Sequence, residues 1–574
     1  MSHANALPLS LRLALVIAVL AAPGLSQAQT ERISLSTSGG DPNSDVIAPV
    51  CSDDGRYVAF SSLATNLVLG DANGDSDVFV RDRVTGTTSL VSLSTGGQQA
   101  DDFSNQPAIS GDGRRIAFMS KADNLVAGHS NTFGDIYLRD LPTQTTTLVT
   151  GATGGVIIDV SEDMAHLSHD GDRITFASPA SLGVPGQLAE IWVFEVSTGT
   201  TTLVSDVPAG STTGPGNGHS TYAQISADGQ HVAFVSQASN LVTGDLNGKL
   251  DVFVRDLQTN LTELASLDSA GVQANGNSHR PSLSADGRFV AFESVGTNLV
   301  PGDTNGFPDV FVRDRQLGTT VRVSSASLAL GGAQGDGFSG YADLAGNGRH
   351  VVFTSFATTL VPDDTNGALD VFRHDLLSGT TARVSVSSAG AQANALSEDP
   401  EITSDGRLIV FPSKAWNLAP GDNNGLRDIY LRDLGAPAPE SYCSAKANSQ
   451  GCTPSISFTG SSSLALGDLH VGAQGVLNQK NGLLFWGLTP AALPFQGGTR
   501  CVSAPLVRTP LQASGGNPLP ADCSGSYDLH WSAGYTAAKG LTAGDTVYSQ
   551  YWSRDGASPS GTGLTDALVV TFQP

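Results

Sequence analysis

Apolar and polar positions alternate in short runs along most of the chain, and one order of runs returns repeatedly. In the clearest copy, a short run at 281–284 precedes the turn Asp286-Gly287, and Arg288–Glu293 (RFVAFE) follows it. A long loop then leads to the runs Asp309–Asp314 and Val321–Ser324. Alternation with a period of two residues predicts strands, and Asp-Gly between two such runs predicts a hairpin turn. The unit is therefore predicted to be a four-stranded antiparallel sheet.

This unit occurs seven times in the chain. Successive turn dipeptides lie 58, 58, 58, 58, 61 and 58 residues apart. The dipeptides are Asp54-Gly55, Asp112-Gly113, Asp170-Gly171, Asp228-Gly229, Asp286-Gly287, Asn347-Gly348 and Asp405-Gly406. Seven four-stranded units with no amphipathic helix between them predict an all-β fold, a seven-bladed β-propeller.

The seventh copy is incomplete, because it stops at Gly435 without a fourth strand. The missing pattern stands near the other end of the chain, where Glu31–Ser36 (ERISLS) matches the fourth-strand run Ala382–Ser387 (ARVSVS). We therefore expect the N-terminal strand to complete the last blade and close the ring, which removes exposed sheet edges.

The repeated pattern S-x-D-G-R-x-[VI]-x-F, followed by D-[VI]-[FY]-[VL]-R-D, resembles the TolB-type propeller repeat of bacterial envelope proteins, which is related in plan to WD-repeat propellers. The resemblance covers about residues 31–435. It implies the fold more strongly than a function, because propellers serve many functions. Copies two and three depart most from the pattern: the second has His129 and Asn131 in its long loop, and the third shortens this loop.

Residues 1–28 have the features of a secretory signal peptide. Arg12 is their only formal charge, Leu13–Leu20 is an unbroken apolar run, and Ser26-Gln27-Ala28 offers small residues for cleavage. The apolar run is short for a bilayer span, and no later stretch approaches 18 apolar residues. We expect an exported protein, periplasmic or extracellular, without a membrane span.

The composition changes after the propeller region 29–435. A short linker at 436–442 precedes residues 443–574, which contain strand-like runs such as Gly482–Gly487 and which we expect to form a small disulfide-braced β-sandwich. Its four cysteines suit two disulfides, and of three pairings proximity alone favours Cys443–Cys452 with Cys501–Cys523. The fifth cysteine, Cys51, stands where another copy has Leu283, so a buried thiol is favoured over a reactive one. Three tryptophans of this domain are expected in its core, with sugar stacking as the alternative; they are Trp486, Trp531 and Trp552.

Acidic residues exceed basic ones by 54 to 30, which gives a net charge of −24 and argues against a nucleic-acid partner. Five copies place Asp-x-Asn-Gly-x-x-Asp before the third strand, a set of oxygen ligands on a glycine-containing turn that suits calcium. The alternative is capping of the turn by its own side chains. The candidate ligands are Asp71, Asn73, Asp75, Asp77, Asp245, Asn247, Asp251, Asp303, Asn305, Asp309, Asp364, Asn366, Asp370, Asp422, Asn424 and Asp428. Calcium is the one cofactor that the sequence suggests.

Segments just before the innermost strands are expected to approach the central channel of the ring. Polar residues there could bind a small ligand or catalyse an elimination, and the alternative is a hydrated rim without a specific ligand. The candidates are Asp102, His219, His279, Arg280, Asp336 and Asp399.

The chain contains no G-x-S-x-G, no H-E-x-x-H and no paired C-x-x-C motif. The sequence therefore favours a non-catalytic binding or scaffold protein, whose propeller faces would bind a protein or an envelope glycan. The alternative is a secreted carbohydrate-active enzyme, a polysaccharide lyase or a glycoside hydrolase, with its site at the channel mouth.

Overall fold

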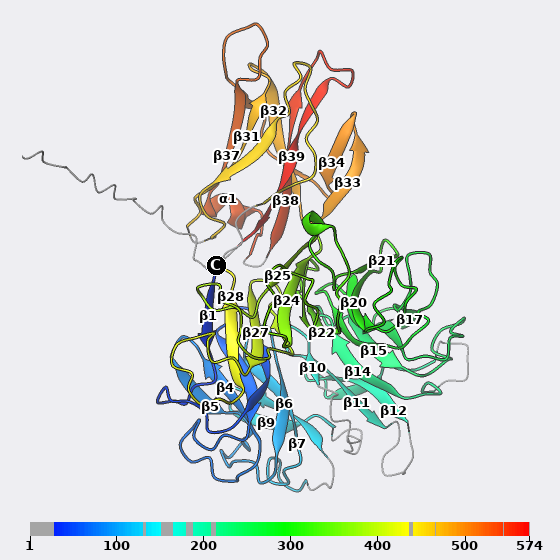
Figure 1. Ribbon diagram of the computed structural model, residues 1–574, viewed down its shortest axis with the longest axis vertical. Helices are drawn as coiled ribbons and strands as arrows, with labels where there is room; N and C mark the ends of the chain where they lie inside the picture. The colour runs from blue at the N-terminus through cyan, green and yellow to red at the C-terminus, as the bar shows by residue number, and fades with distance from the viewer. Residues whose placement is uncertain are drawn as a thin grey trace, which may run out of the picture.

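The computed structural model of the protein describes residues 28–129, 134–150, 165–179, 188–207, 214–435, 440–464, 466–542 and 545–572. The predicted signal segment falls outside these ranges except for its last residue. Figure 1 shows a ring of sheets, coloured blue to yellow, with a second domain, coloured orange to red, on one side of it. In the described ranges, no helix is long and apolar enough to cross a membrane.

Seven four-stranded antiparallel sheets form the ring, as predicted. The first three blades are formed by β2 (Val46–Cys51), β3 (Tyr57–Ser62), β4 (Asp77–Asp82) and β5 (Thr87–Leu90); β6 (Ser104–Ile109), β7 (Arg115–Ser120), β8 (Asp135–Asp140) and β9 (Thr145–Leu148); and β10 (His166–Leu167), β11 (Arg173–Pro179), β12 (Ala189–Glu195) and β13 (Thr200–Leu203).

The next three blades repeat this order of strands along the chain. They are formed by β14 (Ser220–Ile225), β15 (His231–Ser236), β16 (Asp251–Asp256) and β17 (Leu261–Leu264); β18 (Ser278–Leu283), β19 (Phe289–Ser294), β20 (Asp309–Asp314) and β21 (Thr319–Arg322); and β22 (Ser339–Leu344), β23 (His350–Ser355), β24 (Asp370–Asp375) and β25 (Thr380–Arg383). A single 3-10 turn, η2 (Leu328–Leu330), lies between blades 5 and 6.

Blade 7 joins the two ends of the ring. It contains β26 (Glu401–Ile402), β27 (Leu408–Ser413) and β28 (Asp428–Asp433), and its outer strand is β1 (Gln29–Arg32) from the start of the chain. The pairing runs from Gln29 opposite Asp433 to Arg32 opposite Tyr430. The predicted closure is therefore confirmed, with the strand beginning two residues earlier than the sequence pattern suggested.

Each blade is held by apolar side chains of its two central strands. In blade 5, Phe292 and Phe311 are fully buried and stack with ring centroids 5.9 Å apart. The aspartate side chain stabilises each Asp-Gly turn. In blade 5, Asp286 accepts hydrogen bonds from Ser284 Oγ at 2.7 Å and from Arg288 N at 3.0 Å. Gly287 has φ +66° and faces His231 of the preceding blade, so the turn is both left-handed and closely packed.

The second domain is a β-sandwich with a small hairpin beside it. One sheet has the order β29 (Glu440–Tyr442), β39 (Thr562–Thr571), β38 (Thr546–Arg554), β32 (Asn481–Gly487) and β35 (Val507–Arg508), with β36 (Gln512–Ala513) also on β32. The other has β30 (Ser455–Thr459), β31 (Leu469–Val476) and β37 (Gly525–Trp531), while β33 (Pro490–Phe495) pairs with β34 (Gly498–Val502). A short helix, α1 (Ala533–Ala538), follows β37.

The tryptophans of this domain divide between core and surface. Trp486 and Trp531 are buried in the core with rings 5.5 Å apart, as expected. Trp552 is only partly buried. The domain also contacts the ring, because Leu377 of blade 6 packs against the cluster that contains Tyr548.

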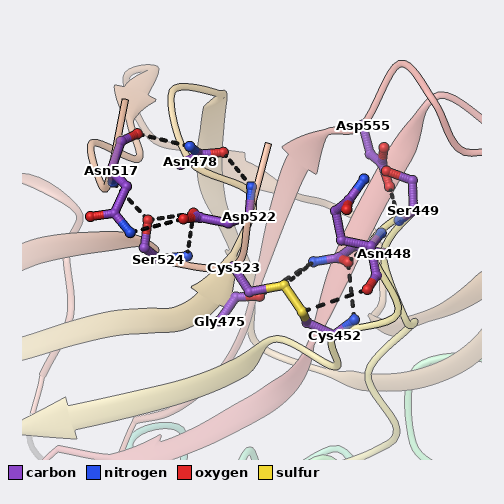
Figure 2. The surroundings of a disulfide bond; sticks show 11 residues. Asn448, Ser449, Cys452, Gly475, Asn478, Asn517, Asp522, Cys523, Ser524 and Asp555 are labelled. Atoms are coloured by element: carbon purple, nitrogen blue, oxygen red, sulfur yellow. Dashed lines mark hydrogen bonds between the residues drawn. A yellow bond between two sulfur atoms is a disulfide. The ribbon is translucent and has the colours of Figure 1, made fainter. Parts of the chain in front are cut away.

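The four cysteines form two disulfides, but the pairing predicted from proximity is wrong. Cys443 bonds to Cys501 and Cys452 bonds to Cys523, across 58 and 71 residues of sequence. Figure 2 shows the second bond, in which the turn of Cys452 is held by Asn448. Strand pairing decides the partners, because β29 and β31 bring distant segments of the chain together, whereas sequence neighbours need not be neighbours in a sandwich.

Candidate functional site in the propeller channel

The innermost strand of each blade bends where it faces the channel. In five blades the pairing between the first and second strands shifts register by a β-bulge. Six non-glycine residues at the matching positions have φ between 46° and 53°, a region that costs side-chain-bearing residues free energy. We call these residues the mouth ring: Ala48, Gln106, Tyr222, Arg280, Tyr341 and Asp399.

At three positions the backbone of the mouth ring donates a hydrogen bond to the preceding blade, and at Tyr341 the acceptor is Glu293. Gln106 N donates to Ser61 Oγ at 3.1 Å, and Asp399 N donates to Thr354 Oγ1 at 3.0 Å. These backbone contacts are alike, although the side chains of the mouth ring differ from blade to blade. The blades therefore fix the strained backbone and leave the side chain free to vary.

Arg280 is the cation of the mouth ring and lies between two aromatic rings. Its guanidinium carbon is 4.1 Å from the ring centroid of Tyr341 and 5.4 Å from that of Tyr222. Behind it, Glu293 accepts from Arg280 Nη1 at 3.2 Å with one oxygen and from Tyr341 N at 3.2 Å with the other. Glu293 is buried, so this pair fixes the guanidinium in one place.

Two residues further along each innermost strand lies a second set of channel residues. We call it the inner ring: Val50, Ala108, His166, Gln224, Ser282, Asp343 and Glu401. Its side chains also differ from blade to blade, and most of them are polar.

Part of the inner ring joins neighbouring blades. Asp343 accepts from Ser282 Oγ of blade 5 at 2.8 Å and from Ile402 N of blade 7 at 2.9 Å. Ser282 in turn accepts from Leu344 N at 2.9 Å. An innermost strand has an unpaired edge, and these side chains supply hydrogen-bond acceptors to its amides.

The electrostatics of the channel shift three titratable groups. Burial raises the pKa of Asp343, and burial together with the charges of Asp343 and Asp399 raises the pKa of Glu401 well above its ordinary value. Burial lowers the pKa of His166 to about 4. Near neutral pH the shift of His166 favours its uncharged form, and the shift of Glu401 favours the protonated form over a wider pH range than for an ordinary carboxyl group.

Two cavities follow the channel and share the inner ring. The first, of about 120 Å³, is lined by Arg280, Tyr222, Tyr341 and Asp399 together with inner-ring residues. The second, of about 160 Å³, lies toward the Asp-Gly turns. His166, Gln224, Asp343 and Glu401 line both cavities, so the inner ring separates a mouth chamber from a chamber on the other face.

The residues predicted for the channel mouth fall into two groups. Arg280 and Asp399 line the mouth chamber. The other four lie outside its lining and serve local contacts. Asp102 and Asp336 are exposed, and they accept from Phe103 N and Thr358 N. His219 is exposed, and its Nδ1 accepts from Ala189 N. His279 is half-buried opposite Glu293 on the neighbouring strand.

The sequence interpretation missed Tyr222, Tyr341, Asp343 and Glu401. The signal that could have found them is present in the repeats. Aligned on the turn dipeptide, the positions six and four residues before it change in almost every copy, whereas the strands around them keep their pattern.

The Asp-x-Asn-Gly-x-x-Asp loops lie away from the channel, between the second and third strands. Their last aspartates are fully buried, and in blade 5 Asp309 accepts from Ser324 Oγ at 2.6 Å and from Asn305 Nδ2 at 3.0 Å. The asparagine also caps the turn, since its Oδ1 accepts from Phe307 N at 3.0 Å. The capping alternative therefore has direct geometric support in this loop.

An arginine stands between the two carboxylates of three loops. Arg322 lies 3.7 Å from Asp303 and 3.6 Å from Asp309. Arg383 and Arg32 take the same place in blades 6 and 7, beside the pairs Asp364/Asp370 and Asp422/Asp428. In blade 1 an amide takes this role, because Gln99 Nε2 donates to both Asp71 and Asp77 at 2.8 Å. Across the described ranges, no group of three or more His, Cys, Asp or Glu side chains is placed to hold a metal ion.

Comparisons with known proteins identify no family for this chain. No protein-family model and no curated protein matches the chain. Similar solved structures include TolB from Acinetobacter baumannii, with 18% identity, a TM-score of 0.30, and coverage of 49% of this chain and 54% of that one. The β-propeller domain of the Trilobed protease from Pyrococcus furiosus has 12% identity, a TM-score of 0.41, and coverage of 67% and 94%. Oligogalacturonate lyase from Vibrio parahaemolyticus has 11% identity, a TM-score of 0.40, and coverage of 71% and 97%.

The chain thus spans about half the length of that TolB. At these identities and scores the similarities carry no argument about activity. The propeller assignment rests on the pairing of the strands.

Proposed function

We propose that this protein is an exported, non-catalytic binding protein, which presents the mouth chamber of a rigid propeller to a protein or an envelope glycan. One observation carries the proposal: the six mouth-ring residues share a strained backbone, five of them line the mouth chamber, and their side chains vary between blades that are otherwise alike. Backbone strain that is retained at one place in a structure is a mark of functional sites.

The chemistry of the mouth chamber suits recognition. Arg280 offers a fixed guanidinium for a carboxylate, and the two tyrosine rings beside it offer flat surfaces for a sugar or a side chain. Two disulfides fit an oxidising compartment, in keeping with the signal-like segment at 1–28. The acidic net charge of −24 disfavours nucleic acid as the partner.

Binding to immobilised mature protein tests this proposal, with polygalacturonate as an acidic glycan, dextran as a neutral one and a detergent extract of cell envelopes as probes. We expect Arg280→Ala and Tyr341→Ala to weaken binding of the retained probe at least tenfold. Arg114→Ala, an exposed arginine on an Asp-Gly turn, is the matched control. Equal binding by all three variants, each with a normal thermal melt, would place the binding surface elsewhere on the protein.

A second candidate function rests on Glu401. A carboxyl group whose pKa is raised well above its ordinary value can act as a general acid, and Arg280 lines the same chamber and could stabilise a developing negative charge. On this reading the protein is a polysaccharide lyase or a glycoside hydrolase. Incubation with polygalacturonate separates the two functions: turnover that Glu401→Gln abolishes while binding persists supports the enzyme, and binding without turnover supports the binding protein.

A further inference from the structure

Every blade begins its third strand with a buried acid, and the surroundings of these acids can be compared blade by blade. In blade 4 this acid is Asp251, which is 0% exposed and accepts from Ser266 Oγ at 2.6 Å with its Oδ1. The first aspartate of the same loop, Asp245, is 7% exposed. Blade 4 thus buries the same two carboxylates as blades 5, 6 and 7.

Blades 5, 6 and 7 provide a positive charge for this pair from one register position. Arg322, Arg383 and Arg32 each lie opposite the third-strand aromatic residue, at Phe311, Phe372 and Tyr430. In each case the oxygen nearest the guanidinium on the buried aspartate is Oδ2, at 3.6 or 3.7 Å.

Blade 4 lacks that charge. The residue opposite Phe253 is Leu264, which cannot approach a carboxylate as a cation. Asp251 Oδ2 is buried and has no hydrogen-bond partner in the part of the chain that the structure describes. Gln273 does not bridge the pair as Gln99 does in blade 1, because its Nε2 donates to Gly244 O at 3.1 Å and reaches only Asp245, at 3.4 Å.

We propose that a hard divalent cation, with calcium as the matching ion, binds between Asp245 and Asp251 in the place that the arginine occupies in blades 5, 6 and 7. Two buried carboxylates without a counter-charge are costly, and oxygen ligands of this kind suit calcium, with water completing the coordination. This site is separate from the channel, so it stands or falls independently of the proposed binding function.

Calorimetric titration of CaCl₂ into chelator-stripped mature protein tests the proposal. The key variant is Leu264→Arg, which gives blade 4 the guanidinium of its sisters. We expect calcium binding in the unchanged protein, with a dissociation constant of about 10⁻⁴ to 10⁻³ M as in weak extracellular sites. The Leu264→Arg variant should bind calcium at this site at least tenfold more weakly and melt at a higher temperature in EDTA than the unchanged protein.

Leu90→Arg, the same change in blade 1, is the matched control and should leave the blade 4 site intact. Asp251→Asn should also remove the binding, but the conclusion does not depend on it, because Leu264→Arg retains both carboxylates. No heat of binding and no change in melting temperature with calcium would overturn the proposal. So would a folded Leu264→Arg variant that binds calcium as tightly as the unchanged protein.

Discussion

The channel wall and the acidic loops are built on the same repeat, yet they differ in how far the copies agree. The loops keep their two aspartates and the asparagine in five blades, and the asparagine caps the turn in each of them. In blades 5, 6 and 7 the asparagine also donates to the buried aspartate. The mouth ring keeps its backbone conformation, and the side chains of both the mouth ring and the inner ring change from blade to blade. In a repeat protein, residues that are the same in most copies indicate a structural requirement of the blade. Side chains that vary at one fixed position indicate where a ligand could be recognised.

The test with the largest expected effect is Arg383→Leu, which removes the arginine beside the acidic loop of blade 6. Arg383 Nη2 lies 3.3 Å from Asp364, and Nε lies 3.6 Å from Asp370, with all three side chains buried. Removing one partner of a buried charge group costs about 3–5 kcal/mol, and we expect a loss of this size in urea-induced unfolding. Arg56→Leu, which breaks a more exposed pair with Asp82, should cost much less. Equal losses in both variants would mean that the loops do not depend on their internal cation.

The second test uses pH on the loop of blade 7. Burial raises the pKa of Asp428 from its ordinary 3.8 to about 6. The folded state therefore holds this proton more tightly than the unfolded chain, so the contribution to stability is full below about pH 4 and is lost as the pH rises through about 6. Asp428→Asn should remove a pH-dependent difference of up to about 3 kcal/mol, measured by urea unfolding between pH 4 and 7. Asp102→Asn, at an exposed site outside the loops, is the control for the removal of one carboxylate.

The third test addresses the cross-blade contacts of the inner ring. Ser282→Ala removes one donor to Asp343 and one acceptor for Leu344 N, both in buried surroundings. We expect a loss of about 1–2 kcal/mol in unfolding free energy. Ser378→Ala, which removes an exposed hydroxyl contact in a turn, should be close to neutral. If Ser282→Ala were also neutral, the cross-blade contacts of the inner ring would not stabilise the fold. Its polar residues would then all be available for a ligand.

The smallest test addresses the strain of the mouth ring. Ala48 has φ 50°, which glycine adopts at no steric cost, so Ala48→Gly should raise the unfolding free energy by less than about 1 kcal/mol. Ala342→Gly, at a neighbouring position of blade 6 that is not left-handed, should lower it. The difference between the two melting temperatures measures the strain, and a loss in both variants would argue that the mouth ring is unstrained.

Much of the fold could be predicted from the sequence because its determinants are local and repeated. The turn dipeptides fix where each hairpin lies, and Asp309–Asp314 was predicted with the bounds that the structure has. Closure by the N-terminal strand was also predictable, since the missing strand pattern of blade 7 is present near Glu31.

The rest depends on contacts between distant segments. Cys443 and Cys501 meet because of strand order in the sandwich, which proximity in sequence does not encode. Asp343 joins three blades, and nothing next to it in the sequence indicates this. The arginines that contact the loops lie outside the loop sequences: Arg322 and Arg383 follow in the fourth strand, and Arg32 lies at the start of the chain. The loop sequences alone therefore contain only the carboxylates, which suggested a metal site in all five copies.

The closing strand has a consequence for how the ring is made. Thr30 and Arg432, which are hydrogen-bonded across the closing pair, are 402 residues apart in sequence. During synthesis β1 emerges first, and its partner β28 emerges only after the other six blades have been made. Until then the ring is an open stack of sheets with an unpaired strand at one end, and joining ends so distant carries a large entropic cost. Ring closure is thus expected to be the final and slowest step of folding, and blade 7 is where an incompletely folded chain would be recognised and degraded.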